Sequence, residues 1–187
     1  LQRLSRDGWV EIHHGKTTRV RDYWREGNLL ILTAIARHRE IAQYEFVTQL
    51  LEVRLVLAPE YARLAIENDP ARVDALLREL LEMKDTPAEF SCKDFDLHKQ
   101  LTVLSGNPIF TLILNGFGDL YQEMGEIYFA NPLAREASRS FYSTLRTAIQ
   151  ANDTRKAYEV VRDVMAKSIE YWKAASRQAG LGPKESD

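Results

Sequence analysis

Four prolines, each preceded by a residue that commonly caps helices, constrain the fold more than any other feature of this sequence. The pairs are Asp69-Pro70, Thr86-Pro87, Asn107-Pro108 and Asn131-Pro132. A side-chain oxygen at the cap position accepts a backbone N–H, and proline suits the first helical position because an N–H is not needed there. A fifth start is predicted at 152–154, and stops at Gly106 and Gly180. The predicted helices are 22–37, 43–67, 70–84, 88–105, 108–130, 132–150 and 153–178.

The chain is therefore predicted to be mainly α, with an antiparallel bundle of six or seven helices after a connecting helix at 22–37. The overall composition agrees, because 45% hydrophobic and 28% charged residues are typical of a folded globular protein. No apolar run reaches the roughly 18 residues that a membrane span needs. Cys92 is the only cysteine, which excludes an internal disulfide and suits a reducing compartment, so a cytoplasmic protein is expected.

The first 21 residues differ from the rest. Residues 1–6 are helix-like, 9–13 alternate as a strand does, and 17–20 return as a second strand after a turn at Gly15. This segment carries a net charge of +3, which leaves −5 for the remainder. A helix end followed by a basic hairpin is typical of the second half of a winged helix-turn-helix, and the alternative is an ordinary surface hairpin. The charge asymmetry favours contact with a polyanion.

Helical spacing predicts three polar side chains on inward faces. Arg54 lies on the apolar stripe of 43–67, and Asp94 and His98 lie one turn apart on 88–105. A buried arginine must be paired, so Arg54 is either a structural ion pair or an anchor for an anionic ligand. Asp94 and His98 could chelate a metal. A hydrogen-bonded buried pair, involving Arg54 as well, is the favoured interpretation.

Large amphipathic aromatic residues share these inward faces. They include Tyr121 and Tyr128 on 108–130, Phe141 or Tyr142 on 132–150, and Trp172 beside Ser168 on 153–178. Such stripes usually form ordinary core, but their mixture with inward polar groups favours a ligand cavity. We expect no enzyme activity, because no nucleophile and base share a helical face and no phosphate-binding loop is present.

Three runs carry a resemblance to a known family: LQRLSRDGWVEIHHGKTTRVRDYW, SGNPIFTLILNG and YFANPLAR. They resemble the GntR family of transcription regulators, in particular its regulators of fatty-acid metabolism, in register from residue 1 to about 178. The resemblance implies a homodimeric repressor and activator that releases operator DNA when long-chain acyl-CoA enters its helical domain, with no cofactor. It implies a partial winged helix-turn-helix at 1–21, a linker at 22–37, an effector domain at 38–180 and a frayed tail at 181–187. Because the first residue is Leu1, we expect the sequence to begin within a longer protein.

The resemblance also implies site residues. For DNA it implies His14, Gly15 and Lys16 at the wing tip, with Arg3 and Arg6 near the backbone. For the acyl-CoA it implies Arg54, Tyr121, Tyr128, Tyr142, Ser168 and Trp172. The inward Asp94 and His98 are added to these as candidate ligand-binding residues from their helical spacing.

The sequence departs from the family pattern at three of its positions. Val164 and Met165 alter the predicted pocket, and His98 restores half of a metal site found in some relatives. Tyr142 and Val164 stand where two further histidines would complete that site, so no metal is expected. The alternatives are a regulator of the same architecture that senses a small carboxylate, through a metal at Asp94 and His98, and a helical scaffold without a ligand.

Overall fold

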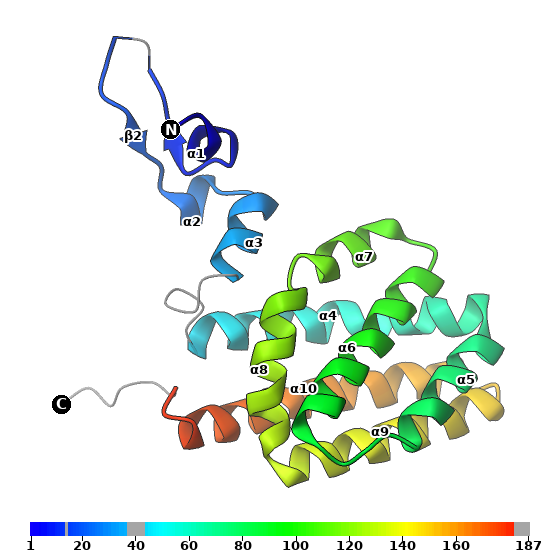
Figure 1. The fold of residues 1–187 in the computed structure, drawn as a ribbon. Helices are drawn as coiled ribbons and strands as arrows, with labels where there is room; N and C mark the ends of the chain where they lie inside the picture. The colour runs from blue at the N-terminus through cyan, green and yellow to red at the C-terminus, as the bar shows by residue number, and fades with distance from the viewer. Residues whose placement is uncertain (14, 37–43, 182–187) are drawn as a thin grey trace. The chain divides into compact units, whose positions relative to one another are not determined.

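The computed structural model describes residues 1–13, 15–36 and 44–181, which fall into two compact units, Leu1–Ala42 and Gln43–Asp187. The first unit contains α1 (Gln2–Arg6), β1 (Val10–Glu11), β2 (Arg19–Val20), α2 (Tyr23–Glu26) and α3 (Leu29–Ala36). The second contains α4 (Tyr44–Asn68), α5 (Pro70–Leu81), α6 (Pro87–Leu104), α7 (Pro108–Asn115), α8 (Gly118–Ala130), α9 (Pro132–Gln150) and α10 (Thr154–Gln178). The prediction of a mainly helical protein is confirmed (Figure 1).

The predicted hairpin of the first unit is present but short. β1 and β2 pair antiparallel, with Val10 opposite Val20. Gly15 has a φ of +75°, and no atom lies within 4 Å of where its Cβ would be, so a glycine at the turn is explained by backbone conformation alone. Its neighbour at position 14 lies outside the described residues. Val10, Ile31 and Ile35 are buried in this unit.

The prediction of one helix over 22–37 is wrong. Gly27 is extended, with φ −74° and ψ 167°, and it separates α2 from α3. The new helix begins because the Asn28 side-chain oxygen accepts the N–H groups of Leu30 at 2.9 Å and Ile31 at 3.3 Å. Asn28 is thus a helix cap that the apolar periodicity concealed.

The predicted caps of the second unit are confirmed. The side chains of Asp69, Thr86, Asn107, Asn131 and Asp153 each accept a backbone N–H from the first turn of the helix that follows. Gly106 and Gly180, the predicted stops, have φ values of +74° and +72°. Because these signals act within one helical turn, they are independent of how the helices pack.

Two predicted helix boundaries are wrong in this unit. The helix expected at 108–130 is two helices, since α7 ends at Asn115 and α8 begins at Gly118. The N–H groups of Gly116 and Phe117 bond three residues back, to Ile113 and Leu114, which tightens and ends α7. The helix expected at 70–84 ends at Leu81.

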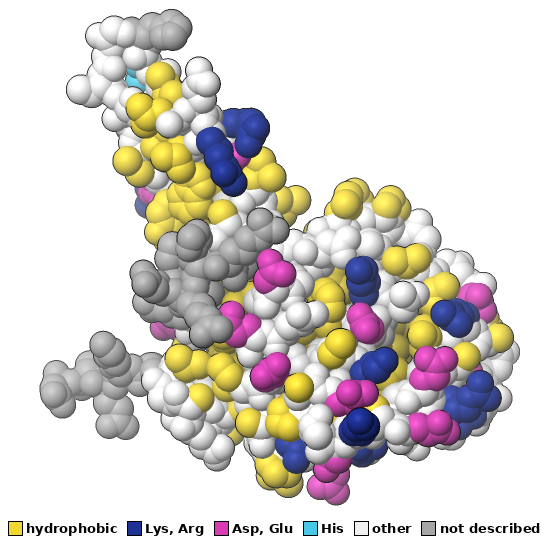
Figure 2. Space-filling view, viewed as in Figure 1, with side chains coloured by type: hydrophobic (Ala, Val, Ile, Leu, Met, Phe, Trp, Pro, Cys, Tyr) yellow, Lys and Arg dark blue, Asp and Glu magenta, His cyan; other side chains and the backbone are white. Residues whose placement is uncertain are grey.

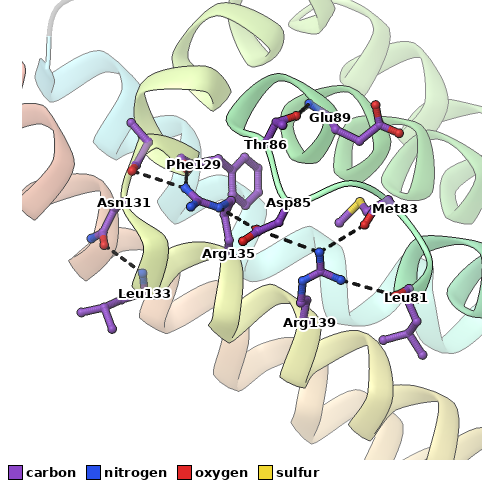
Figure 3. Close-up of polar contacts among 11 residues, drawn as sticks. Leu81, Met83, Asp85, Thr86, Glu89, Phe129, Asn131, Leu133, Arg135 and Arg139 are labelled. Atoms are coloured by element: carbon purple, nitrogen blue, oxygen red, sulfur yellow. Dashed lines mark hydrogen bonds and ion pairs between the residues drawn. The ribbon is translucent and has the colours of Figure 1, made fainter.

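Arginines of α9 hold the connection between α5 and α6 and the end of α8. Arg139 donates to the carbonyl oxygens of Leu81 at 3.4 Å and Met83 at 3.2 Å, immediately after α5. Arg135 donates to the Phe129 carbonyl at 2.5 Å and to Asp85 at 2.8 Å, so it ties the end of α8 to the loop before α6 (Figure 3). These contacts satisfy helix-end carbonyls that have no partner within their own helix.

The two longest helices of the second unit, α4 and α10, pack antiparallel. Trp172 near the end of α10 contacts Tyr44 at the start of α4, whereas Arg63 near the end of α4 lines a surface depression with Arg155 of early α10. In Figure 1, α4, α9 and α10 run along the length of the unit, and α6 and α8 are inclined to them. Ser91 of α6 donates to the Gln122 carbonyl of α8 at 2.8 Å. The buried core draws on every helix of this unit except α7.

Candidate ligand cavity

A cavity of about 140 Å³ lies within the second unit. Most of its wall comes from α4, α7, α8 and α10, whereas α6 contributes one residue and α9 contributes two. The lining is largely aliphatic and aromatic, including Leu51 and Leu57 of α4, Phe110 of α7 and Met124 of α8. An apolar cavity with few polar groups is the usual form of a site for a small, mostly hydrophobic molecule.

Asp94 is the centre of the polar groups beside this cavity. Its Oδ2 accepts from Arg54 Nη2 at 3.2 Å and from the Tyr121 hydroxyl at 2.5 Å, and its Oδ1 accepts from the Tyr142 hydroxyl at 2.7 Å. The four residues come from four different helices, α4, α6, α8 and α9. Their cluster therefore joins the walls of the cavity, and the predicted pairing of the inward arginine is confirmed.

His98 extends the cluster away from the cavity. Its ring is fully buried, and Nδ1 shares a hydrogen bond of 2.7 Å with the Tyr61 hydroxyl. Nε2 lies 3.9 Å from Asp94 Oδ2 and has no hydrogen-bond partner. Arg54 Nε is likewise buried without a partner. The predicted inward position of His98 is confirmed, but the side chain does not line the cavity.

Burial and charge set the protonation of the cluster. Burial and the nearby Arg54 together lower the pKa of His98 to about 3, against the opposing effect of Asp94, so the ring is neutral at pH 7. Burial alone would raise the pKa of Asp94, but the His98 ring, the Arg54 guanidinium and two phenol hydrogen bonds bring it below its usual value. Burial raises the pKa of Tyr61 to about 12 and that of Tyr121 well above its usual value. The cluster at pH 7 is one ion pair surrounded by neutral donors.

The remaining predicted ligand residues lie at the cavity, apart from Tyr142. Tyr128, Ser168 and Trp172 line it, whereas Tyr142 is fully buried behind Asp94. Trp172 is 1% exposed, stacks on Tyr44 at 6.4 Å between ring centroids and donates from Nε1 to the Tyr44 carbonyl at 3.4 Å. The cavity wall is thus connected to the first residue of α4.

The short helix α7 is the part of the wall that the sequence did not assign to the site. Phe110 and Ile113 line the cavity, while Ile109 and Leu112 are 57% and 66% exposed. Figure 2 shows hydrophobic side chains on the surface at the position of α7. The signal available in the sequence was the apolar character of Pro108–Asn115, in which only Thr111 and Asn115 are polar.

The described ranges contain no group of three or more His, Cys, Asp and Glu side chains placed to hold a metal ion. Asp94 and His98 are near one another; of the two positions where the family resemblance would place further ligands, Tyr142 donates to Asp94 and Val164 is apolar. Cys92 is exposed on α6. No helix in the part of the chain that the structure describes is long and apolar enough to cross a membrane.

The residues expected to contact DNA lie in the first unit. Arg3 and Arg6 have side chains that are 87% and 76% exposed, and both face Asp7, at 3.9 and 3.4 Å. Lys16 follows Gly15 at the exposed turn between the strands. His14, the remaining member of the predicted set, lies outside the described residues. The described members are all available at the surface.

Comparison with known proteins gives consistent matches over most of the chain. The family model described as the FadR C-terminal domain matches residues 21–180. A relative from Yersinia enterocolitica is 39% identical over 165 residues, which is 88% of this chain and 67% of the relative. Relatives from Serratia proteamaculans and Cronobacter sakazakii are 35% and 38% identical, over 93% and 92% of this chain and 73% and 72% of their own lengths. All three are named fatty acid metabolism regulator protein.

Proposed function

The chain belongs to the FadR C-terminal domain family, and we propose that it is a transcriptional regulator of fatty-acid metabolism. In this proposal its helical unit binds a long-chain acyl-CoA, its first unit contacts operator DNA, and binding of the ligand releases the DNA. The names of its relatives support the regulatory role. The nature of the ligand is argued from the cavity.

The observation that carries the ligand assignment is the length and apolar character of the cavity wall. Along α4 the lining extends from Val47 to Tyr61, which corresponds to about 21 Å of helix. Along α10 it extends from Val164 to Trp172, about 12 Å. An elongated apolar cavity suits a long alkyl chain, whose burial is favourable for every methylene that leaves water.

The polar cluster favours the same ligand over a small carboxylate. Arg54 is the only cation in the described lining, and Asp94 already neutralises it. A small anion would have to compete with that carboxylate for the guanidinium, and it would leave most of the apolar wall unfilled. An acyl chain uses the apolar wall and does not require a free cation there.

Ligand binding can influence the beginning of α4 through Trp172. The indole lines the cavity, and its contacts with Tyr44 reach the first residue of α4, which follows the segment connecting the two units in sequence. A ligand that displaces Trp172 would thus displace the start of this helix. Allosteric coupling is typically worth about 1–3 kcal/mol and is reciprocal, so DNA should weaken acyl-CoA binding by the same factor.

Thermal unfolding in the presence of oleoyl-CoA, free CoA and citrate tests the ligand assignment. A ligand that binds only the native state raises its stability by about 2.7 kcal/mol at a hundred times its Kd. We expect oleoyl-CoA alone to raise the Tm. Stabilisation by citrate and not by oleoyl-CoA would refute the assignment and favour a small-carboxylate sensor, whereas no stabilisation by any of them would favour a scaffold.

Two valine variants test whether the stabilisation by oleoyl-CoA arises from binding in this cavity. Val164 and Val160 are both half-buried and lie one turn apart on α10, but only Val164 lines the cavity in the described structure. Val164→Trp should fill the cavity and abolish the response to oleoyl-CoA, while Val160→Trp should keep it. An equal response in the two variants would exclude this cavity as the site.

Contact of the first unit with DNA has a separate test. Phosphate contacts make the affinity for DNA fall with salt, by a slope of about 0.9 for each neutralised phosphate. Lys16→Ala should therefore weaken binding to duplex DNA and lower that slope, whereas Lys173→Ala, in the helical unit, should do neither. An unchanged slope for Lys16→Ala would remove this residue from the interface.

A further inference from the structure

The cavity has an accessible rim and a closed inner end. At the rim, Val53 is 50% exposed, and Ile113 and Phe117 are half-buried. The inner end is the part of the wall formed by buried residues, and α9 contributes two of these, Ser138 and Phe141, which are 6% and 5% exposed and lie about one turn apart. A chain that enters from the rim therefore ends against buried side chains, including those of α9.

Met165 stands beside this inner end. It lies on α10, which packs directly against α9, and it lines the cavity while being only 3% exposed. It belongs to the same buried core as Phe141 and Phe129, which also line the cavity. We propose that Met165 determines the longest acyl chain that the cavity accepts, an inference that rests on the proposed function because it requires an acyl ligand.

The surroundings of Met165 explain why this side chain, and not those of α9, would set the depth of the cavity at its inner end. The α9 side of the inner end is held by Arg135, which bonds the end of α8 and Asp85, and by Arg139, which bonds the α5–α6 connection (Figure 3). Phe141 has a stiff ring. Methionine instead has an unbranched, flexible side chain that fills irregular space, so its size sets the remaining depth.

The test is isothermal titration of the whole chain with myristoyl-, palmitoyl-, stearoyl- and arachidoyl-CoA, each below its micelle concentration. Met165→Ala removes the thioether arm and leaves space that an additional part of the acyl chain can occupy. Burial of one more methylene strengthens binding about fourfold. The preference for stearoyl- over palmitoyl-CoA should therefore rise, by up to about 15-fold for two methylenes.

Met83→Ala is the matched control. Met83 is also a buried core methionine, at 8% exposure, but it is not among the residues that line the cavity. Its truncation should leave the order of affinities as in the unmodified protein. Met165→Phe should shift the preference toward shorter chains, which keeps the proposal testable if Met165→Ala does not fold.

The outcomes separate this inference from the function on which it rests. A shift to longer chains in Met165→Ala, or to shorter chains in Met165→Phe, with Met83→Ala unchanged, supports the role of Met165. Identical chain-length profiles in all variants would overturn it while leaving acyl-CoA binding intact. If the unmodified protein binds none of the four esters, the proposed function fails and the inference falls with it.

Discussion

The neutral, buried His98 makes a quantitative prediction about stability in mild acid. Its pKa in the folded protein is about 3, against an ordinary value of 6.5. As the pH falls below 6.5, the unfolded chain binds a proton at this residue and the folded protein does not. The contribution of the neutral His98 to the free energy of unfolding is therefore fully present above pH 6.5 and is lost progressively as the pH falls toward 3.

The magnitude follows from the difference between the two pKa values. Each pH unit in this window lowers the free energy of unfolding by about 1.4 kcal/mol. Because the effect begins only near pH 6.5, the total loss between pH 7 and pH 5 is about 2 kcal/mol. Asp94 does not contribute there, because its pKa is lowered and it stays ionised in both states. The predicted loss at pH 5 therefore comes from His98 within this cluster.

Urea unfolding followed by far-ultraviolet circular dichroism at pH 7 and pH 5, at constant ionic strength, measures the loss. His98→Asn offers the Tyr61 hydroxyl a neutral acceptor that does not titrate, so this variant should lose about 2 kcal/mol less than the unmodified protein. His13→Asn, at a site 44% exposed, is the control and should behave as the unmodified protein. Equal losses with and without His98 would refute a neutral, buried imidazole.

Three other substitutions test individual contacts. Asp94→Asn leaves Arg54 buried without its counter-charge and should cost about 3–5 kcal/mol in urea unfolding; adding Arg54→Met should recover part of this, and an unchanged stability would contradict the pairing. Gly125→Ala places a Cβ in collision with Ser91 Oγ, so the Tm should fall by an amount corresponding to about 1–3 kcal/mol. Because alanine otherwise favours a helix, a rise in Tm would show that α6 and α8 can separate. Arg135→Ala removes bonds to the end of α8 and to the α5–α6 connection and should cost about 1–3 kcal/mol in the same assay, and no loss would mean that water replaces them.

Sequence reasoning succeeded where one helical turn determines the structure. The caps at Asp69 and Asn131 act on backbone N–H groups two or three residues away, so their effect could be predicted without knowledge of the fold. The breaks at Gly27 and Gly116 were missed. Apolar periodicity continues through both, and only the backbone shows that a helix ends there.

The inward orientation of the candidate site residues could be predicted from the sequence, but their hydrogen-bond partners could not. The spacing of Arg54, Asp94 and His98 indicated that all three point inward. The spacing could not reveal that the Asp94 carboxylate accepts hydrogen bonds from both Tyr121 and Tyr142, because those residues belong to different helices. Nor could it separate the aromatic residues that line a cavity from those that fill core, which depends on how six helices of the described chain close around the space.

Fluorescence of Trp172 tests the central claim, that a long acyl chain occupies this cavity, most directly. Trp172 lines the cavity, whereas the other two tryptophans, Trp9 and Trp24, belong to the first unit. In a Trp9→Phe/Trp24→Phe protein, titration with oleoyl-CoA should change the remaining emission and saturate at one ligand per chain. Free CoA should have no effect. An emission that does not change while oleoyl-CoA binds, or that responds equally to free CoA, would contradict the proposed site.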